Sequence, residues 1–153
     1  MQGSPSILRS DRLDEIAEAL PQRASTLAKL FLSLTGLQVS QTEVGVLQAL
    51  SDRSMRITEL ARNESVTQPA ITLLVNRLQA QGWVTREADP GDRRAVLVAI
   101  TQAGSNVFAE LRSQYRALLH QEMAILGDED VETLARATDI LDGLIERLKE
   151  REP

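Results

Sequence analysis

The sequence predicts a mostly α-helical (α+β) fold that carries one β-hairpin, and three observations support this. Only four of the 153 residues are aromatic, so the core is aliphatic, which favours packed helices over an aromatic-rich β-sandwich. Apolar residues recur at helical spacing through most of the chain. One stretch, residues 83–100, changes instead to two β-prone runs on either side of a turn sequence.

The composition excludes several kinds of site. The chain has no cysteine, which excludes a disulfide framework, a thiolate zinc site and a cysteine nucleophile. His120 is the only histidine, and one histidine without cysteine does not make a transition-metal site. Nucleotide-binding glycine motifs, a P-loop and a serine-hydrolase elbow are missing from the sequence. We therefore expect no metal, no cofactor and no enzymatic activity.

The cellular location of the protein is predicted from the length of its apolar segments. None approaches the roughly 18 residues that span a bilayer, and Met1–Ser10 lacks the pattern of a secretory signal. We expect a cytoplasmic protein without a membrane partner. At roughly 100–200 residues per domain, the length fits one domain, or one domain with an appended element.

The first helix is predicted over residues 12–34, where apolar residues share one face. Pro21 predicts a kink or a late helix start, and Gly36 ends the segment. Ser40, followed by Glu43, is typical of a capping box and predicts a helix over residues 40–52. A short helix over residues 57–63 follows.

The next helix is capped by Thr67, has a proline in its first turn, and ends at Gly82. At 100° per residue, four apolar side chains point inward: Ile71, Leu74, Val75 and Leu78. The opposite face carries Pro69, Thr72, Leu73, Asn76 and Ala80, with Gln68 and Arg77 on its flanks. Thr, Asn, Gln and Arg side chains suit hydrogen bonds to base edges and phosphates.

The hairpin pairs residues 83–87 with residues 95–100 across a polar tip. Arg93 and Arg94 lie at this tip, where arginine suits the negative potential of a narrow minor groove. We expect Asp92 to hold the loop, either by accepting from backbone N–H groups or by pairing with Arg86 or a neighbouring arginine, so that Arg94 points outward.

From residue 101 the helical period returns, and the last helix has a 3-4-3-4-3 apolar spacing typical of helix–helix packing. This seam is either a core stripe or a dimer interface, and we favour the interface because little else is present to cover it. We assign residues 1–36 and 101–153 to a dimerisation region and 37–100 to a winged helix-turn-helix lobe. The predicted dimer contacts are Leu13, Ile16, Leu20, Val131, Leu134, Leu141, Ile145 and Leu148.

A helix-turn-helix followed by a hairpin wing places one helix in a major groove and the wing beside it. The charge distribution permits this: residues 56–104 are net +1, although the whole chain is −5. Leu73 either contacts a thymine methyl or is a lone exposed leucine, and Arg77 is free to pair with a carboxylate on its own helix. The predicted DNA contacts are Thr67, Gln68, Pro69, Thr72, Leu73, Asn76, Arg77, Arg86, Asp92, Arg93 and Arg94.

These residues resemble the MarR family of winged helix-turn-helix regulators. The most specific part is a wing with Asp92-x-Arg94 that leads to a strand ending in Thr-x-x-Gly. The resemblance runs through Ile57–Ala61, Thr67–Leu78, Gly82–Arg86, Asp89–Ala95 and Leu97–Gly104. This sequence departs from the family at Leu73, where members often have a basic residue, and at Asn76, where an acidic one is common.

The resemblance implies an obligate homodimer that represses transcription from a double-stranded operator. It also implies a small aromatic or anionic effector that modulates DNA affinity. A twofold dimer predicts an inverted repeat with half-sites about one helical turn apart. A second hypothesis stays open: a winged-helix module that binds proteins and does not read DNA.

Overall fold

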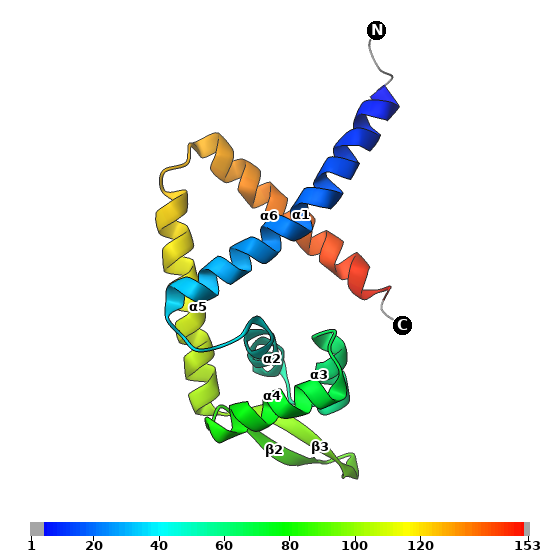
Figure 1. Cartoon of the computed structure of the whole chain (residues 1–153), viewed down its shortest axis with the longest axis vertical. Coiled ribbons are helices and arrows are strands. Elements are labelled where there is room, and N and C mark those ends of the chain that lie inside the picture. Colours follow the sequence, from blue (N-terminus) through cyan, green and yellow to red (C-terminus); the bar gives the residue numbers. More distant parts are fainter. Residues whose placement is uncertain (1–4, 152–153) are drawn as a thin grey trace. The chain divides into compact units, whose positions relative to one another are not determined.

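The computed structural model describes residues 5–151, apart from the side chains of residues 5–7 and 93. Within this range the chain forms six helices and a three-stranded antiparallel sheet (Figure 1). The mostly helical α+β prediction is confirmed. The elements are α1 (Pro5–Thr35), α2 (Gln41–Asp52), β1 (Met55–Arg56), α3 (Ile57–Asn63), α4 (Gln68–Ala80), β2 (Val84–Asp89), β3 (Asp92–Ile100), α5 (Gln102–Met123) and α6 (Asp128–Lys149).

The chain divides into two compact units, and the division falls within α5, between Arg112 and Ser113. The first unit contains α1 to β3 and the first half of α5. The second contains the rest of α5 and all of α6. The core cluster of the chain lies in the first unit, between α2, α3, α4 and the sheet.

The inward face predicted for α4 is confirmed. Ile71, Val75 and Leu78 have no exposed surface, and Leu74 is 6% exposed. Each such side chain contributes about 1.5–3 kcal/mol through burial, so the four together fix which face of α4 remains on the surface. That face is the one with the polar side chains.

The helix ends follow the local sequence. The Ser40 hydroxyl accepts from the Glu43 backbone N–H at 3.2 Å, and the Glu43 carboxylate accepts from the Ser40 N–H at 2.7 Å, which confirms the capping box. Thr67 caps α4 by accepting from the Ala70 N–H at 3.4 Å.

The end of α4 comes two residues before the predicted Gly82, at Ala80. Gly82 instead follows the helix in a left-handed conformation, with φ +76°. The Gly82 N–H donates to Gln79 O at 2.9 Å and the Trp83 N–H donates to Leu78 O at 2.9 Å. This is the Schellman pattern, in which glycine lies just past the last helical residues.

The α1 helix begins before Pro21 and runs through it. The predicted late helix start is therefore wrong. Figure 1 shows that the helix axis changes direction about midway along its length. A proline removes one N–H and crowds the preceding turn, and a long helix accommodates this by bending.

The sheet has the order β1-β3-β2. Its hairpin is longer than predicted because the pairing of β2 with β3 continues to Asp89 and Asp92, past an irregularity after Ala88. Strand β1 was not predicted. It pairs Met55 with Val98 and Arg56 with Leu97, and two residues are too few to show an alternating pattern.

The Thr-x-x-Gly segment attaches the start of α5 to the start of β2. The Thr101 N–H donates to Trp83 O at 2.9 Å, and the Thr101 hydroxyl accepts from the Gly104 N–H at 3.1 Å. A Cβ on Gly104 would lie 2.1 Å from the Trp83 carbonyl oxygen. Only glycine permits this approach. Trp83 itself is half-buried and packs against the core.

The second unit exposes most of its apolar side chains. None of the residues of α6, all of which are described, is buried. Three acidic residues lie in the first turn of α6 and two basic residues in its last turn, which stabilises the helix through its dipole. No helix in the part of the chain that the structure describes is long and apolar enough to cross a membrane.

Candidate nucleic-acid interface

The exposed face of α4 is the first component of the candidate interface. Leu73 is 70% exposed and Asn76 lies on the same face. The Thr72 hydroxyl donates to Gln68 O at 2.9 Å within the first turns of the helix. Pro69, Gln68 and Thr67 are exposed beside it. A helix that exposes amides, a hydroxyl and one apolar side chain can form hydrogen bonds and methyl contacts in a major groove.

Arg86 connects the wing to this face. Its guanidinium donates through Nη2 to Asn76 Oδ1 at 2.6 Å and through Nη1 to the Gln79 side-chain oxygen. The alternative in which Asp92 pairs with Arg86 is therefore wrong. Arg86 follows the buried Val84 by two residues on β2, and this register places it beside α4.

Arg77 also pairs with a partner outside α4. Its Nε lies 3.4 Å from Glu43 Oε1 on α2. The alternative of a partner on its own helix is wrong. Glu43 is only 3% exposed, so its carboxylate depends on the Ser40 N–H and on Arg77 for polar partners.

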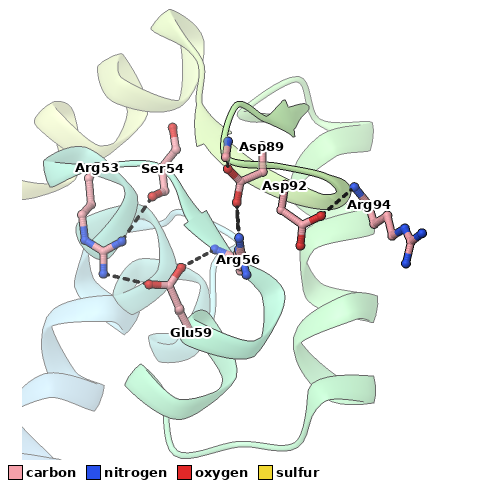
Figure 2. A network of polar contacts seen from close by, with 8 residues as sticks. Arg53, Ser54, Arg56, Glu59, Asp89, Asp92 and Arg94 are labelled. Atoms are coloured by element: carbon pink, nitrogen blue, oxygen red, sulfur yellow. Dashed lines mark hydrogen bonds and ion pairs between the residues drawn. The ribbon is translucent and has the colours of Figure 1, made fainter.

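The tip of the wing is ordered by Asp92. Its Oδ1 accepts from the Arg94 backbone N–H at 3.0 Å, which confirms the first of the two roles predicted for it. Figure 2 shows the Arg94 side chain extending away from the Asp92 carboxylate. The side chain of Arg93 lies outside the described part of the structure.

The base of the wing is fixed by a contact that the sequence analysis missed. Arg56 donates to Asp89 Oδ2 through Nε at 2.9 Å and through Nη2 at 2.5 Å, and Asp89 Oδ1 accepts from the Gly91 N–H at 2.8 Å (Figure 2). The hydrogen bond from Arg56 is the largest cause that lowers the pKa of Asp89, and Asp89 in turn raises the pKa of Arg56. Asp89 was interpreted only as part of a turn sequence.

A second carboxylate extends this network to the start of α3. Glu59 accepts from the Arg56 backbone N–H at 2.8 Å and from Arg53 at 3.1 Å (Figure 2). The backbone hydrogen bond is the largest cause that lowers the pKa of Glu59. Glu59 lies at the third position of α3, where a carboxylate that reaches back to the preceding N–H is half of a capping box. The spacing of three residues from Arg56 to Glu59 is the sequence feature from which this capping box could have been predicted.

The residues predicted for dimerisation expose apolar surface within each unit. In α1, Leu13 is 56% and Ile16 50% exposed, while Leu20 is half-buried. In α6 the exposed side chains of the predicted seam are Val131, Leu134, Ile145 and Leu148, and Leu141 is half-buried. Among the described residues, no group of three or more His, Asp or Glu side chains is placed to hold a metal ion.

Helix α3, the turn after it and α4 form a helix-turn-helix, and β2 and β3 form the wing beside it (Figure 1). The chain is a winged helix-turn-helix protein. Residues 39–96 match the family model described as the MarR family. In this region the chain resembles the MarR family, as the sequence analysis indicated.

The relatives and structures that it resembles agree with this. An HTH-type transcriptional regulator of Bacillus subtilis, YcgE, is 31% identical over 103 residues, which are 63% of this chain and 65% of YcgE. The HTH-type transcriptional repressor MdtR of the same organism is 26% identical over 101 residues, 65% of each protein. The crystal structure of wild-type Escherichia coli MarR without ligand has a TM-score of 0.69 at 27% identity, covering 84% of this chain and 96% of that one.

Proposed function

We propose that this protein is a sequence-specific, double-stranded DNA-binding transcriptional repressor that acts as a homodimer on an inverted repeat. The observation that carries the proposal is the polar face of α4 beside a wing whose tip presents Arg94. The predicted contacts on both elements belong to the proposed interface, Arg86 through the α4 side chains that it holds. The names of the relatives, among them an HTH-type transcriptional repressor, support the regulatory role.

In the proposed complex, α4 and the wing make different contacts with DNA. The α4 face is narrow enough to enter a major groove, where base edges differ in their donors and acceptors. Arg94 supplies a cation for the neighbouring groove or phosphates. In a twofold dimer the two copies of α4 would read half-sites about 34 Å apart, roughly 10 bp.

The test is a selection of bound sequences from a random duplex pool, followed by titration of the best sequence by fluorescence anisotropy at several salt concentrations. The proposal expects a palindromic consensus and an affinity that falls steeply with salt, because phosphate contacts release counterions. Arg94→Ala should weaken binding by roughly 1–3 kcal/mol if the arginine is buried in a groove. Arg136→Ala removes the same charge from α6 and serves as the control.

The second candidate is a module that binds protein partners. The net charge of −5 favours it, because an acidic chain is not the usual footprint of a DNA-binding protein. It expects no consensus from the selection and no affinity for duplex DNA at low salt. Either result would overturn the DNA-binding proposal.

The proposal also includes a small-molecule effector that modulates the affinity for DNA. A small aromatic or anionic molecule would release DNA only if it binds better to a dimer whose half-site spacing does not match the operator. A thermal-shift screen of aromatic carboxylates would detect a ligand through the stabilisation that it causes. A hit should then lower affinity for the selected operator, and a hit that leaves this affinity unchanged would rule the molecule out as an effector.

A further inference from the structure

The contact between Arg86 and the two amides of α4 determines more than the position of the wing. A guanidinium carries only donors. An amide that faces it must therefore present its oxygen to the arginine and its nitrogen elsewhere. Asn76 and Gln79 lie three residues apart on one helix face, and both are exposed. One arginine thus fixes the orientation of both amides.

We propose that Arg86 is a positioning residue that makes Asn76 a hydrogen-bond donor, so that the base pair facing Asn76 in the target DNA is read as guanine. This rests on the proposed DNA-binding function and names the specificity of that same site. Guanine presents two acceptors, N7 and O6, in the major groove, whereas thymine presents only O4 and cytosine presents a donor. The Asn76 N–H₂ group therefore suits the guanine edge best and is repelled by cytosine.

Adenine is disfavoured for a related reason. The usual asparagine contact with adenine is bidentate, and its amide oxygen accepts from adenine N6. In this protein the Asn76 oxygen already accepts a charge-assisted hydrogen bond from Arg86 at 2.6 Å. Charge-assisted bonds are roughly twice as strong as neutral ones. This bond occupies one of the two lone pairs of the oxygen and holds the amide in one orientation, with its nitrogen directed away from Arg86.

Two variants distinguish a positioning role of Arg86 from a direct contact with DNA. Arg86→Lys keeps the positive charge, but a single ammonium cannot span both amides as the planar fork does. Asn76→Asp keeps an acceptor for Arg86 but removes the donor, and a carboxylate suits cytosine N4. Arg136→Lys is the matched control, because it makes the same substitution on α6.

The experiment selects bound sequences from a random duplex pool with the wild-type full-length chain and each variant, after thermal melts show that all are folded. Titrations on the selected duplexes then measure the preference at each position. For the wild type we expect one position where guanine is preferred by about tenfold. In Arg86→Lys this preference should fall to about threefold or less. In Asn76→Asp the same position should change toward cytosine.

Three other outcomes of this experiment would each contradict a specific part of the proposal. If Arg86→Lys weakens binding to all sequences alike, Arg86 is a direct DNA contact and the positioning role is wrong. If the guanine preference survives in both variants, Asn76 does not read that base. If the wild type selects no consensus, the DNA-binding proposal itself fails, and this result differs from the other two because it appears before any substitution is made.

Discussion

The Arg56 guanidinium lies 2.5 Å from the Asp89 carboxylate, although 33 residues separate the two in the chain. The contact joins the residue that precedes α3 to the end of β2. It is partly exposed, with 44% of the Arg56 side chain and 13% of the Asp89 side chain accessible. The base of the wing is thereby tied to the helix-turn-helix.

We predict that Arg56→Ala weakens operator binding by about two- to fivefold, because an exposed ion pair stabilises a geometry only modestly. The loss should come from a less fixed wing, so the salt dependence of binding should change little. Fluorescence anisotropy on the selected operator measures both quantities.

Arg53→Ala is the matched control for this prediction. Arg53 carries the same charge and pairs with Glu59 at 3.1 Å, whereas Asp89 pairs with Arg56. It should have a smaller effect. Equal losses in the two variants would mean that charge, and not the attachment of the wing, is responsible.

Asp89 and Glu64 are two carboxylates whose pKa values are shifted in opposite directions, and each should make the stability depend on pH. The pKa of Asp89 is lowered below its ordinary 3.8, so its stabilising contribution is fully present above pH 3.8 and is lost as the pH falls through the lowered value. Urea denaturation of the wild type and Asp89→Asn should differ near pH 6 and converge as the solution is acidified below pH 3.8.

Glu64 should behave in the opposite way. Burial raises its pKa above the ordinary 4.5, and its carboxylate lies over Gly45, close to where a Cβ would stand. Since the ionised form is disfavoured in the folded protein, stability rises as the pH falls through the raised pKa toward 4.5. Glu64→Gln should be more stable than the wild type at pH 7, and the difference should vanish below pH 4.5. A Glu64→Gln protein that is less stable at pH 7 would contradict this.

Gly104→Ala should destabilise the protein by about 1–3 kcal/mol, since the added methyl would lie 2.1 Å from a backbone oxygen and the overpacked segment must shift. Gly143→Ala is the control: it lies within α6, and its nearest neighbour would be the Arg147 guanidinium at 3.6 Å. It should stabilise by about 0.5–1 kcal/mol, because alanine favours the helix. Urea titrations measure both, and equal effects would refute the close approach of α5 to β2.

The seam of α6 yields a prediction about assembly. Leu141→Glu with Ile145→Glu should give a monomer that does not bind DNA, because charged groups in an apolar interface are costly to desolvate. Light scattering should give twice the 16.9 kDa chain mass for the wild type and the single mass for the variant. Arg136→Glu introduces an acid on the other face of α6 and should remain dimeric. A double variant that stays dimeric would contradict the prediction that this seam forms the dimer interface.

The local features were predictable because they depend on neighbours in the sequence. The capping box of Ser40 and Glu43, the Thr67 cap and the inward face of α4 each follow from spacing over a few residues. A contact of Asp92 with a backbone N–H was one of the two alternatives predicted for it, and the structure shows this contact with Arg94, because aspartate commonly accepts from a backbone N–H two residues later. For Pro21 the prediction left two outcomes open, a kink or a late helix start. The local sequence is compatible with both, and so it could not distinguish between them.

What the sequence by itself determined is the set of elements other than β1, their order and the faces that they bury, since periodicity and capping are short-range properties of the chain. The tertiary structure alone decided which charged side chains meet. Arg56 pairs with Asp89, Arg77 with Glu43, and Arg86 with two amides of α4. An arginine has many acceptors within reach of its long side chain, and only the packing of helices against the sheet selects among them.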